Sequence, residues 1–114
     1  TGDLVLREAG RLLRENLRKS DVACRYGGEE FVLVLPGSSL AEAIQRVEQL
    51  RGLFETLEIR QKGQLMATTT ISAGVAAAPE HGATMEALMQ AADKALYAAK
   101  DAGRNRVAAY ELSN

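Results

Sequence analysis

Apolar and charged residues alternate at helical spacing in three segments of the chain. Residues 4–17 place apolar side chains on one face and charged side chains on the other, with Asp3 in position to cap the helix. A second apolar stripe predicts a helix over residues 40–57. A third, alanine-rich helix is expected from its capping residue Thr84 to Ala102. The pattern thus predicts three amphipathic helices.

Strand patterns fill the segments between these helices. Residues 22–26 and 31–35 are expected to be strands, and the second is continuously apolar, which is typical of a central strand covered on both faces. Residues 59–66 predict a small hairpin, residues 68–77 a β-branched strand and residues 107–110 a short last strand. Every helix but the first is therefore preceded by a strand.

The order of these elements indicates the fold class. A strand hairpin that alternates with helices predicts an α+β fold, with the helices packed on a largely antiparallel central sheet. No linker, repeat or low-complexity tract interrupts residues 1–114, so we expect a single domain. Because no strand precedes the first helix, a ferredoxin-like pattern would lack its first strand and helix, and we expect both to lie before Thr1 in a longer protein.

Composition narrows the classes of function. Fourteen basic and fifteen acidic side chains leave a net charge of -1, which argues against binding nucleic acid through bulk charge. Cys24 is the only cysteine and His81 the only histidine, which excludes an intrachain disulfide and a histidine-rich metal site within one chain. No apolar run reaches membrane-spanning length and no signal peptide is recognisable. We expect a cytoplasmic domain without membrane contact. The longer protein that contains it could be anchored to a membrane through an N-terminal region that is missing here.

The most distinctive stretch is RYGGEEF at residues 25–31, which joins two predicted strands. Gly28 tolerates the positive φ of a type II′ turn, and Glu29 and Glu30 should point to opposite faces. One carboxylate should then face a ligand and the other find a separate partner. Two carboxylates about 4 Å apart would repel by roughly 4 kcal/mol at intermediate dielectric, which a divalent cation or Arg25 would relieve. A solvent-exposed hairpin tip has the same composition, so the tetrapeptide alone leaves both interpretations open.

This stretch resembles the signature of the GGDEF family of diguanylate cyclases, in its GGEEF form. TGDLVL at residues 1–6, TISAGVA at 70–76 and ADKALYAAKDAGRNRV at 92–107 match the family in the same order, so the resemblance covers nearly the whole chain. It implies a nucleotidyl-cyclase palm-type fold. It also implies condensation of two GTP molecules to cyclic di-GMP with release of pyrophosphate, in a homodimer in which each domain carries one GTP.

The resemblance implies roles for the residues of the turn. By the family pattern Glu29 is the catalytic carboxylate and binds the metal, with Mg²⁺ (or Mn²⁺) as the cofactor. Hard cations prefer such oxygen ligands, and phosphoryl transfer needs its charge neutralised. Glu30 is implied to support the site by orienting its neighbours. Gly27 and Gly28 would let the substrate phosphates approach the backbone.

Further contacts to GTP are implied outside the turn. Lys100 and Arg104 are four residues apart, so we expect them on one face of the last helix near its C-terminus. Both match the triphosphate-binding cations of the family. Without the resemblance, the two would be read as cations that complement a helix C-terminus. Asp3 matches the residue that contacts guanine, and it can also cap the first helix only if its two oxygens serve different purposes.

A second site is implied by Arg18 and Asp21, which form an R-x-x-D pattern. Five residues lie between Asp21 and Gly27. The pattern resembles the inhibitory site of the family, where cyclic di-GMP binds away from catalysis. Arginine can donate two hydrogen bonds to the O6 and N7 edge of guanine, and aspartate can accept from its N–H groups. The alternative is a helix end followed by a turn. At this spacing we favour the inhibitory interpretation.

The sequence departs from the family in what it lacks. An aspartate that holds the metal and an asparagine that reads guanine would both precede Thr1, so we expect this fragment to be inactive alone. A second class of function stays open, namely a non-catalytic receptor that binds cyclic di-GMP through Arg18 and Asp21 or GTP through the turn. An aspartate at the end of the upstream strand would favour the enzyme, and a substituted residue there would favour the receptor.

Overall fold

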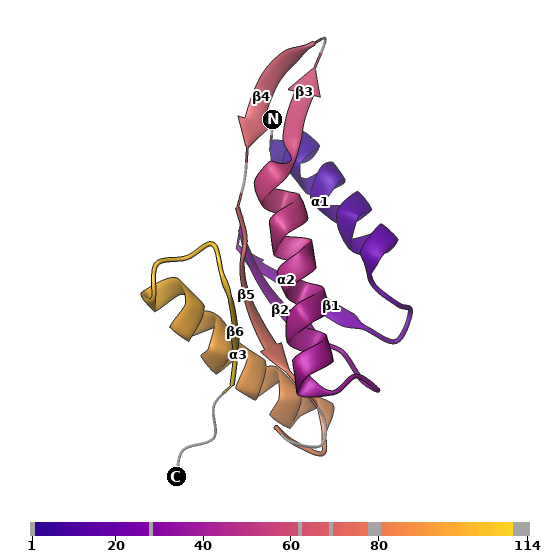
Figure 1. Ribbon diagram of the computed structural model, residues 1–114, viewed down its shortest axis with the longest axis vertical. Helices are drawn as coiled ribbons and strands as arrows, with labels where there is room; N and C mark the ends of the chain where they lie inside the picture. Colours follow the sequence, from indigo (N-terminus) through magenta and orange to yellow (C-terminus); the bar gives the residue numbers. More distant parts are fainter. Residues whose placement is uncertain (1, 28, 62, 69, 78–80, 111–114) are drawn as a thin grey trace.

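The computed structural model describes residues 2–27, 29–61, 63–68, 70–77 and 81–110. Three helices and six strands form in this part of the chain (Figure 1). α1 begins two residues earlier than predicted, so Asp3 lies in its first turn and the predicted cap at Asp3 is wrong. The predicted strand over residues 68–77 in fact contains the last residue of one strand and the whole of the next. The elements are α1 (Gly2–Asn16), β1 (Val22–Gly27), β2 (Glu30–Val34), α2 (Leu40–Thr56), β3 (Glu58–Gln61), β4 (Gln64–Thr68), β5 (Ser72–Ala76), α3 (Met85–Asp101) and β6 (Val107–Ala109).

The α+β fold is confirmed, but the pairing of its main sheet is mixed. The strand order is β1-β2-β5-β6, and β3 and β4 form a separate hairpin that projects beyond α1 and α2 (Figure 1). β1 and β2 are antiparallel, whereas β2 pairs with β5 and β5 with β6 in parallel. The prediction of a largely antiparallel sheet is therefore wrong for the described strands. Helical crossovers through α2 and α3 return the chain to the same end of the sheet, which makes the joined strands parallel.

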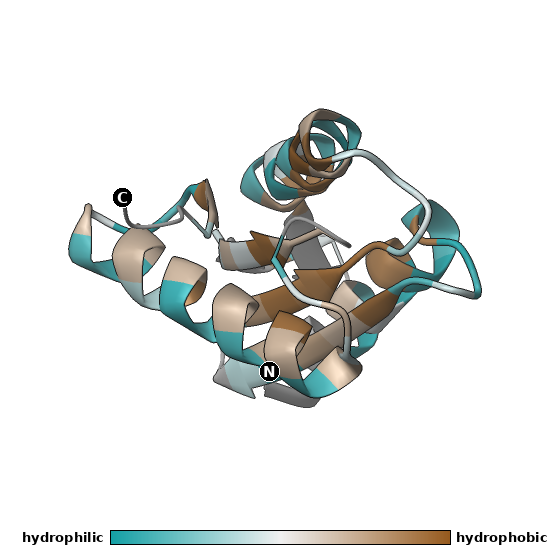
Figure 2. Cartoon of the chain, turned by 90° about the horizontal axis from the view of Figure 1, so that it is seen from below, coloured by the Kyte–Doolittle hydropathy of each residue, from teal (hydrophilic) through white to brown (hydrophobic). Residues whose placement is uncertain are grey.

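Helices cover both faces of the sheet. Alternate residues of β2 point to opposite faces, and both sets are buried, which confirms the predicted central strand. One face packs against α1 and α2, and the other packs against α3. Figure 2 shows the hydrophobic strands between helices whose outer faces are hydrophilic. The sheet is thereby buried between two helical layers, and the turn between β1 and β2 lies at one of its ends.

Candidate functional site

The β1–β2 hairpin carries the two adjacent glutamates. Arg25 is opposite Phe31 and Gly27 is opposite Glu30, so Tyr26 is an extra residue that bulges β1. Gly28 lies outside the described residues, and the turn type stays a prediction. The backbone oxygen of Glu29 accepts a hydrogen bond of 2.8 Å from the N–H of Ser72, which fixes the tip to the start of β5. The carboxylate of Glu29 is left exposed to solvent.

The neighbouring Glu30 pairs with two cations from the far end of the chain. Its Oε1 lies 3.0 Å from Nζ of Lys100, and its Oε2 lies 3.3 Å from Nη1 of Arg104. The hydrogen bond from Lys100, and after it the one from Arg104, lowers the pKa of the Glu30 carboxyl below its ordinary value. The sequence proposed Arg25 as a partner for a carboxylate. The structure instead gives Glu30 the two cations that were predicted only as phosphate ligands.

The end of α3 directs these two cations. Gly103 has a φ of +124°, and its N–H donates to the oxygen of Lys100 at 3.3 Å. The N–H of Arg104 donates to the oxygen of Ala99 at 3.0 Å, which completes the paired bonds of a Schellman cap. The predicted termination at Gly103 is confirmed. Arg104 is not helical, because its φ is +64°, so the idea that it shares a helix face with Lys100 is wrong. The two side chains meet at Glu30 because the chain turns back there.

We expect the Glu30 cluster to make stability depend on pH in a defined direction. The folded state lowers the pKa of Glu30, so the ionised carboxylate stabilises the fold above its unfolded pKa, and this is lost as pH falls through its folded pKa. A Glu30→Gln variant should be less stable than the wild type at neutral pH, and the difference should vanish in acid. Urea unfolding of both proteins over a pH series measures this. The pH dependence should shrink in a Lys100→Ala background, and a difference that is constant with pH would contradict the ion pairs.

A second polar cluster surrounds Asp21. Its side chain is fully buried, and its Oδ2 accepts hydrogen bonds of 2.8 Å from the backbone N–H of Arg18 and from Nη2 of Arg46. Arg46, on α2, was missed by sequence reasoning because no local motif links it to Asp21. Within the described part of the chain, Oδ1 of Asp21 and Nη1 of Arg46 are buried without a hydrogen-bond partner. The cluster therefore keeps unused capacity to accept and to donate.

An open cavity of about 590 Å³ adjoins this cluster. It lies between α1 and the start of β1, and both residues of the R-x-x-D pattern border it. Asp21 also donates its backbone N–H to the oxygen of Arg18 at 3.0 Å, so the turn of the alternative interpretation exists alongside the cavity. The lining residues are Gly10, Leu13, Arg14, Leu17, Arg18, Lys19, Asp21 and Ala23.

The remaining predicted residues receive less structural information. Gly27 ends β1 beside the glutamates, as expected. The side chain of Asp3 lies outside the described residues, and so does Gly28, so their predicted contacts to guanine and phosphate stay predictions. Among the residues that the structure describes, no three histidine, cysteine, aspartate or glutamate side chains converge on a potential metal position. No helix in that same part is long and apolar enough to cross a membrane.

Comparison with protein families and curated relatives gives consistent matches. The family model described as "Diguanylate cyclase, GGDEF domain" matches residues 1–106. Response regulator PleD of Caulobacter vibrioides is 44% identical over 107 residues, which are 93% of this chain and 24% of PleD. Diguanylate cyclase DosC of Escherichia coli is 37% identical over 113 residues, which are 99% of this chain and 24% of DosC. The chain thus spans about a quarter of the length of these relatives.

Solved structures with a similar fold point the same way. The GGDEF domain of PA1120 (TpbB or YfiN) from Pseudomonas aeruginosa superimposes with a TM-score of 0.79 at 36% identity, over 96% of this chain and 64% of that one. The GGDEF domain of DgcB from Caulobacter crescentus, solved in complex with c-di-GMP, gives a TM-score of 0.73 at 27% identity, over 96% of this chain and 65% of that one.

Proposed function

The chain belongs to the GGDEF domain family of diguanylate cyclases, and we propose that the protein carrying it condenses two GTP molecules to cyclic di-GMP and two pyrophosphates. The observation that supports this most is that Lys100 and Arg104 both pair with Glu30, the residue next to Glu29. Carboxylates beside two cations suit a substrate that brings both phosphate charge and a metal ion. The predicted family and fold class are confirmed, and the reaction of this protein remains our proposal.

The two cations would hold the substrate triphosphate. Lysine has three donor hydrogens and the guanidinium of arginine has five, and each uses one nitrogen on Glu30. Donors therefore remain for phosphate oxygens while Glu30 keeps both side chains in place. Because Lys100 is partly buried and Arg104 is largely exposed, we expect Lys100 to be the more precisely held of the two. Their charges would offset the negative charge that moves onto the leaving pyrophosphate.

The carboxylate of Glu29 is suited to a metal ion whose other ligands come from the substrate phosphates, and not to a metal site built from protein ligands alone. Mg²⁺ is commonly bound by one or two carboxylates together with substrate phosphates, and Glu29 is an exposed carboxylate next to the proposed phosphate ligands. We propose that Glu29 holds Mg²⁺ (or Mn²⁺). When bound, such an ion neutralises phosphate charge and favours ionisation of a nearby hydroxyl. Glu29 is also the candidate acceptor for the proton of the attacking 3′-hydroxyl, which would come from GTP on the partner of a homodimer.

Synthesis can be tested directly. The full natural protein incubated with GTP and Mg²⁺ should form cyclic di-GMP and pyrophosphate in a ratio of about 1:2, which follows from joining two nucleoside triphosphates by two phosphoryl transfers. Chromatography of the nucleotides and an assay for pyrophosphate measure both products. Binding of cyclic di-GMP without any turnover of GTP would instead identify a receptor module. If the protein neither binds cyclic di-GMP nor turns over GTP, the proposal is overturned.

We further propose that Arg18 and Asp21 bind the product and inhibit synthesis. The adjoining cavity and the partnerless Oδ1 of Asp21 support this, since guanine offers N–H donors and an acceptor edge. Loss of a bidentate arginine contact costs about 1–3 kcal/mol, so Arg18→Ala should weaken binding of cyclic di-GMP roughly 5- to 150-fold. Calorimetry gives the affinity, and progress curves give the product concentration that halves the rate.

A matched variant separates this effect from the general loss of one positive charge. Arg7 is an exposed arginine on α1 that does not line the cavity, so Arg7→Ala should leave product affinity unchanged. Initial rates without product should stay within a few-fold of wild type in both variants. If Arg18→Ala binds cyclic di-GMP as tightly as the wild type, the pair returns to the interpretation of a helix end and a turn.

A further inference from the structure

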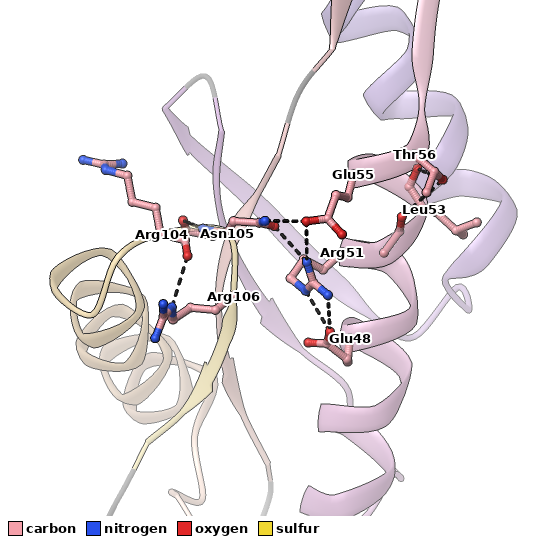
Figure 3. Close-up of polar contacts among 10 residues, drawn as sticks. Glu48, Arg51, Leu53, Glu55, Thr56, Arg104, Asn105 and Arg106 are labelled. Carbon is pink, nitrogen blue, oxygen red and sulfur yellow. Dashed lines mark hydrogen bonds and ion pairs between the residues drawn. The ribbon is translucent and has the colours of Figure 1, made fainter.

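Asn105 directly follows the proposed phosphate ligand Arg104 and connects the loop after α3 to α2 and β5. Its Nδ2 donates to Oε2 of Glu55 at 2.6 Å, and its Oδ1 accepts from Nη1 of Arg51 at 2.8 Å. Its backbone N–H donates to Oγ of Ser72 at 3.1 Å. Figure 3 shows the Asn105 side chain pointing to α2 and the Arg104 side chain pointing away from it. We call Asn105 and its three partners the Asn105 bridge.

The α2 end of the bridge is itself ordered by charge. Nε of Arg51 lies 2.8 Å from Oε1 of Glu48, and Nη1 of Arg51 lies 3.5 Å from Oε2 of Glu55. The hydrogen bond from Asn105, and after it the charge of Arg51, lowers the pKa of Glu55. Both donor and acceptor of the Asn105 amide thus meet charged groups, which makes these hydrogen bonds stronger than neutral ones. Glu55 and Arg51 are only one helical turn apart, so a single face of α2 holds the amide.

The bridge imposes a backbone conformation that Arg104 does not favour by itself. Arg104 and Asn105 have φ values of +64° and +45°, and asparagine tolerates this left-handed region much better than arginine does. The Schellman cap fixes the backbone on the N-terminal side of Arg104, and the bridge fixes it on the C-terminal side. The oxygen of Arg104 also accepts a hydrogen bond of 3.1 Å from Nε of Arg106. Arg104 is therefore held at Glu30 by its flanking residues.

Ser72 links the same bridge to the carboxylate of the turn. Its N–H donates to the oxygen of Glu29 at 2.8 Å, and its buried hydroxyl oxygen accepts from the N–H of Asn105. One residue at the start of β5 thus sets the distance between the proposed metal ligand and the loop of Arg104. A substrate that contacts both would bind best when this distance is already set.

We propose that Asn105, held by Glu55 and Arg51 of α2, is a positioning residue that orders Arg104 for the triphosphate of GTP, an inference that rests on the proposed function. Asn105 touches no substrate and acts through Arg104. Through the bridge, α2 would influence how tightly the site binds the phosphates of GTP but not how tightly it binds guanine. α2 contributes no other group to this site.

The test compares a probe that has phosphates with one that lacks them. In the full natural protein with Mg²⁺, Asn105→Ala should weaken binding of the non-condensable α,β-methylene analogue of GTP about 10-fold, which corresponds to the loss of one well-ordered charge-assisted contact. Affinity for guanosine, followed by nuclear magnetic resonance titration, should be unchanged. Asn16→Ala is a matched control. Asn16 also donates a side-chain hydrogen bond, at 2.7 Å to the oxygen of Leu12, but both residues belong to α1, which holds no residue of the Asn105 bridge.

A double-mutant cycle decides whether Asn105 acts through Arg104. Asn105→Ala should have no further effect on binding of the analogue when Arg104 is already alanine, whereas a general structural defect would add its full cost. Glu55→Ala removes one bridge partner from an exposed helix position, and it should weaken binding in the same direction even if Asn105→Ala does not fold.

The outcomes of this experiment separate the inference from the proposed function. An analogue affinity that changes with Arg104→Ala but not with Asn105→Ala or Glu55→Ala would overturn the positioning role alone. Additive losses in the cycle, or an equal loss of guanosine affinity, would overturn it as well. An affinity that is indifferent to Arg104→Ala would instead reject Arg104 as a triphosphate ligand, and the proposed function would lose that residue first.

Discussion

Replacing Glu29 with glutamine is expected to lower synthesis of cyclic di-GMP by at least about 100-fold, on the scale seen when one preorganised charge is removed from a transition state. Glutamine has nearly the same size and keeps one carbonyl oxygen, but it has no negative charge for a divalent cation. Glu29 is exposed at the hairpin tip, and its structural contact to Ser72 is made by its backbone oxygen. The variant should therefore fold normally and lose only its synthetic activity.

The measurement pairs initial rates with urea unfolding of the full natural protein. Glu86→Gln is a matched control, because Glu86 is another exposed glutamate, in the first turn of α3, and takes no part in the proposed site. It should retain the wild-type rate. A folded Glu29→Gln protein with near wild-type activity would reject Glu29 as the metal-binding carboxylate. Raising the Mg²⁺ concentration should not fully restore the activity of the variant, because the variant lacks the carboxylate that holds the ion.

Local sequence signals predicted the elements of this fold well. The continuous apolar run of β2 indicated a strand covered on both faces, and Gly103 indicated where α3 ends; the structure confirms both. These signals work because burial and positive φ act on single residues or on neighbours. The parallel pairing of β2 with β5 was missed, because it depends on which way a helical crossover returns the chain.

In the candidate site, too, the contacts between distant residues were missed. A motif placed Glu29, Glu30, Lys100 and Arg104 in one proposed function, but it did not show that Glu30 would bind the two cations, since 70 residues separate Glu30 from Lys100. Arg46 at Asp21 and the partners of Asn105 on α2 were missed for the same reason. Arginines and glutamates on an exposed helix face have many possible partners, and only the packing of α2 against its neighbours selects one.

The backbone of α3 packs directly over Gly74 of β5, and here we expect the largest effect on stability. A Cβ on Gly74 would lie 2.1 Å from the oxygen of Ala92 and 2.4 Å from the nitrogen of Leu96. Both are backbone atoms of α3, so no side chain can rotate away and the whole helix must shift. Gly74→Ala should lower the free energy of unfolding by about 3 kcal/mol, the upper part of the range for overpacked cores. The midpoint of urea unfolding measures this.

Gly52→Ala gives the opposite result for the same chemical change, and the pair tests the packing of α3. Gly52 lies within α2, where a Cβ would meet nothing within 4 Å, so alanine should raise the free energy of unfolding by about 0.5–1 kcal/mol through helix propensity. Because α3 ends in Lys100 and the cap that directs Arg104, any Gly74→Ala protein that still folds should also bind GTP more weakly. A variant as stable as the wild type would show that α3 does not lie this close to β5, and the position of both cations at Glu30 would then be in doubt.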